Sequence, residues 1–123
     1  MTTSKLILPI ILFVLTIAAG FWVTKTGKPY NTGIFTLHKL LALAAVVLAT
    51  LAISGSLKTP PVQNLVIILL VLAGLSVVAL FATGALMSIQ KTVSRAWLII
   101  HQIAPIILAG STGAAILLLF KIK

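Results

Sequence analysis

The sequence predicts an all-α integral membrane protein in which four transmembrane helices form an up-down bundle. Three observations predict this fold class. Hydrophobic residues make up 61% of the chain, against roughly 45–50% in soluble domains. They gather in four long stretches, and the short connections between them are rich in Gly, Pro and Lys. The chain has no Asp or Glu, and most of its 9 Lys and Arg residues flank the apolar stretches. We therefore expect one transmembrane domain over residues 1–123.

Each apolar stretch is long enough to cross a bilayer as a helix. In hydrocarbon the backbone polar groups must bond within their own segment, which favours helices over isolated strands. Short connections place sequential helices antiparallel, as in an up-down bundle. The connection TKTGKPYNTG separates the first two stretches, Pro60-Pro61 separates the middle two, and Lys91 lies in the third connection. The predicted helices cover residues 6–24, 34–54, 62–88 and 95–120.

The composition excludes several kinds of site. Without Asp or Glu, the chain has no carboxylate to act as a general base, a metal ligand or a proton carrier. Without Cys, it has no thiolate metal site and no thioether-linked cofactor. Serines lack an acid to complete a triad, so a hydrolase is not expected. The formal charge of +9 lies beside apolar spans, which favours anionic lipid head groups or an anionic cofactor over nucleic acid.

Two histidines are the candidate functional residues. His38 and His101 lie in the first two turns of the second and fourth predicted helices, which begin on the same side of the membrane. Ionisable residues inside a membrane are costly and mark functional sites by default. In a square bundle these two helices lie on a diagonal of roughly 11–14 Å. That separation is too wide for a direct hydrogen bond, but it suits two imidazoles that bind a metal in a flat macrocycle.

Both histidines begin stretches of small residues with the spacing of an inward-facing seam. The expected seam residues are Ala42, Ala45, Ala49 and Ala52 after His38, and Ala104, Leu108, Ser111 and Ala115 after His101. At the same depth, Gly20 and Gly84 would leave room for the macrocycle between the first and third helices. Lys39 and Arg95 are the nearest cations and could pair with its acidic groups. Simple helix packing for the glycines and snorkelling for the cations remain open.

The pattern resembles the small four-helix membrane b-type cytochromes. The resemblance rests on the four spans and on the paired histidine segments FTLHKLLA and LIIHQIAP. It implies non-covalent haem b, with His38 and His101 as axial ligands of the iron and electron transfer as the function. Familiar members of that group stack two haems on four histidines. This chain supplies two, so we expect one haem per chain, close to one membrane face.

Other functions remain open at this point. The chain could be a haem-free accessory or structural subunit of a larger membrane complex, or a small transporter or metal channel. For a cytochrome, the electron-transfer partner could be a quinone or a redox protein. A homo-oligomer is possible for each of these functions. The second nitrogen of each imidazole needs an acceptor, for which backbone carbonyls one turn earlier are candidates. Both termini should lie on one side of the membrane. The Lys and Arg residues divide evenly between the two sides, so the positive-inside rule does not choose the orientation, and a cytoplasmic location of the termini is one of two possibilities.

Overall fold

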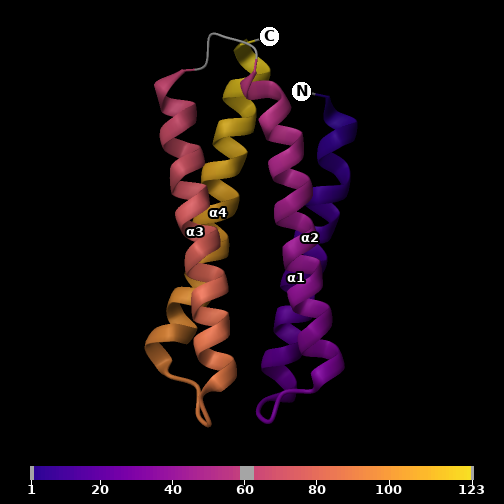
Figure 1. Ribbon diagram of the computed structural model, residues 1–123, viewed down its shortest axis with the longest axis vertical. Helices are drawn as coiled ribbons and strands as arrows, with labels where there is room; N and C mark the ends of the chain where they lie inside the picture. Colours follow the sequence, from indigo (N-terminus) through magenta and orange to yellow (C-terminus); the bar gives the residue numbers. More distant parts are fainter. Residues whose placement is uncertain (1, 59–62, 123) are drawn as a thin grey trace. The chain divides into compact units, whose positions relative to one another are not determined.

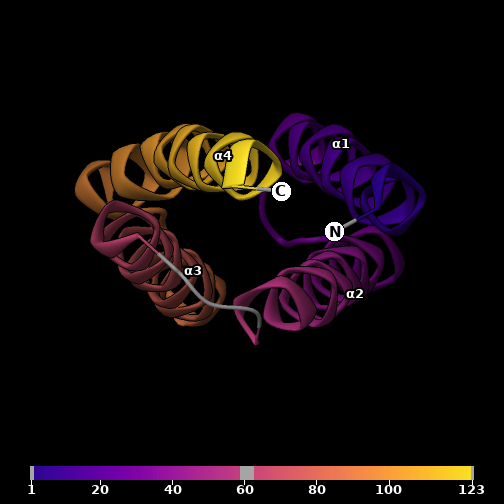
Figure 2. The same cartoon turned by 90° about the horizontal axis from the view of Figure 1, so that it is seen from above.

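The computed structural model describes residues 2–58 and 63–122, and all regular secondary structure in these ranges is helical (Figure 1). The predicted all-α fold class with four helices is confirmed. The helices are α1 (Thr3–Thr26), α2 (Thr32–Leu57), α3 (Asn64–Ile89) and α4 (Arg95–Ile122). The chain divides into two compact units, Met1–Lys58 and Thr59–Lys123. Each unit is an antiparallel hairpin of two packed helices, α1 with α2 and α3 with α4, as Figure 2 shows from above.

All four helices are long and apolar enough to cross a membrane. They contain 24 to 28 residues, which at about 1.5 Å per residue spans roughly 36–42 Å, more than a hydrocarbon core of ~30 Å. Large apolar side chains are exposed along every helix, including Phe21, Ile68 and Ile106 at 72%, 63% and 72%. Such surfaces are unfavourable in water and favourable in lipid. The chain is therefore a multi-pass membrane protein.

The turn between α1 and α2 is defined by local capping. Gly27 ends α1 with φ 66° and donates its backbone N–H to the Val23 carbonyl at 3.1 Å, a conformation that glycine adopts without strain. The Asn31 side chain then accepts the first free N–H groups of α2, from Gly33 at 3.0 Å and Ile34 at 3.2 Å. These caps determine where α2 begins and therefore the depth of His38.

The turn also buries part of an aromatic pair. The Tyr30 and Phe35 rings stack with centroids 5.2 Å apart, and partial burial raises the pKa of the Tyr30 phenol. The Lys28 ammonium lies 4.8 Å from the Tyr30 ring centroid, within the range of a cation–π contact.

Small residues form the buried face of α2. Ala45 and Ala52 are buried, and Ala42 and Ala49 are half-buried. This is the seam that the sequence predicts, and its alternating spacing of three and four residues lets α2 pack closely on α1.

The second hairpin has the same kind of seam. On α4, Ala104, Ser111 and Ala115 are buried and Leu108 is half-buried, as predicted. On α3 the buried residues are Val66, Ala73, Ser76, Thr83 and Met87. The hydroxyl groups in these seams donate to carbonyls of their own helices: Ser76 to Leu72 at 2.9 Å, and Ser111 to Ile107 at 2.7 Å. Buried polarity in the seams is thus satisfied locally.

The observed helices differ from the predicted ranges mainly at their ends. The first two extend to residues 3–26 and 32–57 instead of 6–24 and 34–54, and the fourth extends to residue 122 instead of 120. Polar end residues remain helical until a cap or a breaker intervenes. The third begins at Asn64; the predicted start at Val62, like Pro60-Pro61, lies outside the described residues. The prediction of one domain for the whole chain stays a prediction.

Candidate functional site

His38 lies in the second turn of α2 and faces α1. Its ring is half-buried, and its Nδ1 lies 2.9 Å from the backbone carbonyl oxygen of Thr16. A carbonyl oxygen only accepts hydrogen bonds, so Nδ1 is the donor. In a neutral imidazole the hydrogen on Nδ1 leaves the lone pair on Nε2. Helix α1 therefore selects the tautomer of His38 in which Nε2 can act as a ligand.

Gly20 supplies the space that the His38 ring occupies. A Cβ atom built at Gly20 would lie 3.0 Å from Cε1 and 3.4 Å from Nδ1 of His38. That separation is closer than ordinary van der Waals contact. The absence of a side chain at this position lets the imidazole approach α1 closely enough to reach the Thr16 carbonyl, one turn earlier on α1.

His101 is held in a comparable way by α3, through a side chain instead of the backbone. Its Nδ1 lies 2.9 Å from Thr83 Oγ1, and the same hydroxyl lies 2.6 Å from the Ala79 carbonyl oxygen. A hydroxyl has one hydrogen to donate. If that hydrogen goes to the Ala79 carbonyl, Thr83 Oγ1 must accept from Nδ1–H of His101. The short distance to Ala79 favours this direction, which again leaves the lone pair on Nε2.

Gly84 contacts His101 as Gly20 contacts His38, with more room. A Cβ at Gly84 would lie 3.4 Å from Cε1 and 3.9 Å from Nδ1 of His101, which is ordinary contact. In each hairpin, then, the first helix provides both a partner for Nδ1 and a glycine against Cε1. The sequence prediction that these glycines lie at the level of the histidines agrees with these contacts, and their predicted role beside a macrocycle stays a prediction.

Of the two predicted cationic partners, Lys39 follows His38 directly in the chain and Arg95 lies six residues before His101; both are exposed. The Lys39 ammonium lies 4.5 Å from the Phe35 ring centroid, one turn earlier on α2. Arg95 is the first residue of α4, where the helix dipole disfavours a positive charge. Neither α2 nor α4 has an acidic residue in its first turn. An anion near these helix starts would be stabilised, although the predicted pairing with acidic groups of a cofactor stays untested.

The structure identifies two hydrogen-bond acceptors, the backbone carbonyl of Thr16 and the hydroxyl of Thr83, that the sequence did not indicate as partners of the histidines. We expected acceptors one turn earlier on the same helix, whereas the observed partners, Thr16 and Thr83, come from the preceding helix of each hairpin. The place of Thr83 on the inward seam, next to a glycine, could have indicated from the sequence that it is a partner of His101. The carbonyl of Thr16 leaves no such signal, because every residue has a backbone carbonyl.

The protein ligands that this chain could offer a metal are few. Within residues 2–58 and 63–122, no three His, Cys, Asp or Glu residues lie together. The whole sequence has two His and no Cys, Asp or Glu. A closed metal site built by one chain from such side chains alone would therefore have two ligands, which is fewer than structural zinc sites use.

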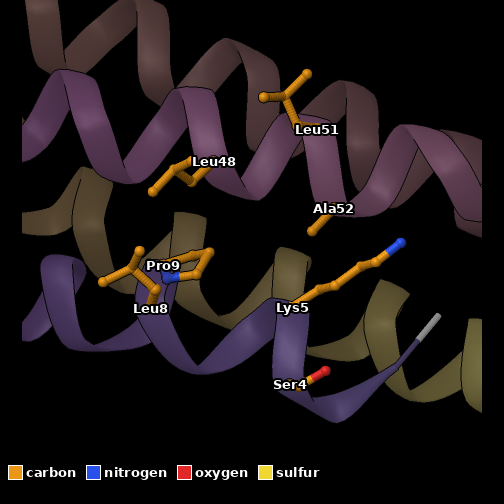
Figure 3. A pocket seen from close by; sticks show the side chains of 7 residues that line it. All are labelled: Ser4, Lys5, Leu8, Pro9, Leu48, Leu51 and Ala52. Carbon is orange, nitrogen blue, oxygen red and sulfur yellow. The ribbon is translucent and has the colours of Figure 1, made fainter.

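A separate groove is lined by side chains of α1 and α2 (Figure 3). These side chains come from the start of α1 and the later part of α2, so the groove lies away from His38 along the hairpin. Its volume is about 360 Å³, and apolar side chains form most of its wall, with Lys5 at one edge. The lining residues are Ser4, Lys5, Leu8, Pro9, Leu48, Leu51 and Ala52. None of the predicted site residues lines it.

Comparisons of the chain with protein-family models, with curated proteins and with solved structures found no match. The geometry of the two histidines therefore carries the functional interpretation.

Proposed function

We propose that this protein is a membrane-bound b-type cytochrome that holds one haem b between His38 and His101 and transfers electrons. The observation that carries the proposal is the hydrogen bonding of the two rings. Each Nδ1 is bonded to the preceding helix, at 2.9 Å in both hairpins. Histidines that bind metals typically donate their other ring nitrogen to a carbonyl or a similar acceptor, which fixes the tautomer and raises the basicity of the ligand.

The donor chemistry of the chain fits this group. Two neutral imidazoles would fill both axial positions of the iron and give a six-coordinate, low-spin centre. The haem supplies one-electron redox chemistry, and the chain supplies orientation, an apolar environment and charge balance. If both histidines hold the iron, no open position would remain for oxygen, which would favour electron transfer over oxygen binding.

The charges of the chain support the same proposal. Haem propionates are anions, and the sequence contains no carboxylate side chain to compete for its cations. We propose that Lys39 and Arg95 pair with the propionates, where an Arg can bind in a bidentate manner. A single haem near the starts of α2 and α4 would not bridge a hydrocarbon core of ~30 Å. The electron partner, a quinone or a redox protein, would therefore act from that face.

An optical spectrum tests the proposal directly. The full chain is expressed with ample haem and purified in detergent, and its spectrum is recorded oxidised and reduced. We expect a Soret band and the sharp reduced bands of a bis-imidazole b-type centre. A protein that purifies without haem under these conditions contradicts the proposal.

One observation favours a second candidate, the haem-free accessory subunit. Two buried imidazoles without hydrogen-bond partners would be costly, at roughly 1–3 kcal/mol each, and that cost would favour a cofactor. In the structure both rings already have a hydrogen-bond partner within their own hairpin. The histidines could then serve helix packing alone. The same optical spectrum separates the two candidates, because an accessory subunit has no Soret band.

The topology yields a prediction that needs no cofactor. Residues 58 and 63 bound the connection between the hairpins, and five steps of at most about 3.8 Å cannot cross the membrane. Since each hairpin returns to the side on which it begins, both termini should lie on one side. Reporter fusions at residues 1 and 123 are expected to give the same location, and opposite locations would contradict the arrangement of four spans.

A further inference from the structure

We propose that Thr83 is the positioning residue of His101. The Thr83 hydroxyl selects the tautomer of the His101 ring that leaves Nε2 as the ligating nitrogen. The assignment of the tautomer is independent of any cofactor. Its consequence for haem binding rests on the proposed function. In the other hairpin a backbone group, the Thr16 carbonyl, takes this role at Nδ1 of His38.

The geometry around Thr83 defines a directed chain of hydrogen bonds. Thr83 is 3% exposed, so water cannot readily replace its contacts. The Thr83 hydroxyl donates to the Ala79 carbonyl at 2.6 Å, which leaves Thr83 Oγ1 to accept from Nδ1–H of His101, 2.9 Å away. A hydroxyl that donates in this way becomes a better acceptor, because linked hydrogen bonds polarise one another. The α3 backbone thus orients the hydroxyl, and the hydroxyl orients the imidazole.

Thr16 provides a matched contrast in the first hairpin. Its hydroxyl donates to the Leu12 carbonyl of its own helix at 2.7 Å, while its backbone carbonyl accepts from His38. Removing the hydroxyl at position 16 therefore leaves the acceptor of His38 in place. Removing the hydroxyl at position 83 removes the group that His101 Nδ1 contacts at 2.9 Å in the described structure. Two chemically identical substitutions are thus expected to have different effects on the two histidines.

The tautomers can be measured by NMR on the full chain labelled with ¹⁵N-histidine in detergent, before haem is added. The sequence has 2 histidines, so replacing one of them assigns both signals. We expect His38 and His101 to carry their hydrogen on Nδ1 in the wild-type chain. In Thr83→Val, His101 should lose this signature and populate the other tautomer, while His38 stays unchanged. Thr83→Ser should restore the wild-type pattern at His101, and Thr16→Val should leave both histidines as they are.

Haem titration of the same variants measures the consequence for binding. Loss of such a partner typically weakens metal-site affinity roughly 10- to 100-fold, so Thr83→Val should bind haem more weakly by that factor. Thr16→Val and Thr83→Ser should bind as the wild type does. Circular dichroism confirms that each variant is helical.

The possible results separate the two proposals. If Thr83→Val keeps the wild-type tautomer at His101, or if the wild-type chain lacks a hydrogen on Nδ1 of His101, the positioning role of Thr83 is overturned. If the tautomers follow the expected pattern but no chain binds haem, the role of Thr83 is supported and the proposed cytochrome function is overturned.

Discussion

A chain carrying both His38→Ala and His101→Ala is expected to purify without haem. The chain has no Cys, Asp or Glu, and these are its 2 histidines, so the double substitution removes the ligands that the proposed site requires. Each single substitution should leave one imidazole on the iron and convert the low-spin spectrum to a high-spin one. The measurement is the haem content per chain, together with the oxidised and reduced optical spectra.

A matched control keeps this result specific. Ser111→Ala removes another buried polar group from the same seam of α4, and that hydroxyl bonds only to carbonyls of its own helix in the described contacts, at 2.7 Å and 3.3 Å. It should retain full haem content and a low-spin spectrum. Undiminished haem in the double variant would show that the haem is held elsewhere, or by another chain, and would refute the axial assignment.

The number of helices and their type could be predicted from the sequence, because the hydropathy of the chain and the spacing of its small residues indicate both. Apolar stretches long enough to cross a membrane must be helical, and the seam of small residues from Ala42 to Ala52 follows from its spacing. The ends of the helices could be predicted less well from the sequence. Hydropathy falls at the first polar residues, yet the helix of α2 continues through Ser54, Gly55 and Ser56 to Leu57.

The site could be predicted in part. The histidines and glycines were recognisable because ionisable residues are rare in membrane spans and glycine alone permits close approach. Each glycine contacts the histidine of its own hairpin. This contact depends on which helix packs on which side, and hydropathy does not encode that. The contact of Lys39 with Phe35 was readable in principle, since residues four apart meet on one helix face. The Thr16 carbonyl was not, because a backbone acceptor has no sequence signature.

Replacing Gly20 with Leu is expected to have the second largest effect, a strong loss of haem with the chain still inserted. At this position even a Cβ would lie 3.0 Å from Cε1 of His38, and the rest of a leucine side chain extends further. The ring would have to move away from α1 and give up its bond to Thr16. Overpacking of this kind costs about 1–3 kcal/mol, which corresponds to roughly 5- to 150-fold in an equilibrium constant.

The two glycines provide a graded test of this steric argument. Gly20→Ala should weaken haem binding measurably, whereas Gly84→Ala should be tolerated because its Cβ would meet His101 at an ordinary 3.4 Å. Gly74→Leu is the control for added bulk in a membrane helix, since a Cβ at Gly74 would have no heavy atom within 4 Å among the described neighbours. Haem titration ranks the variants, and circular dichroism verifies their helix content. Equal affinity for haem in Gly20→Leu and Gly74→Leu would mean that the His38 ring does not depend on the space at Gly20, and the glycine would then serve helix packing alone.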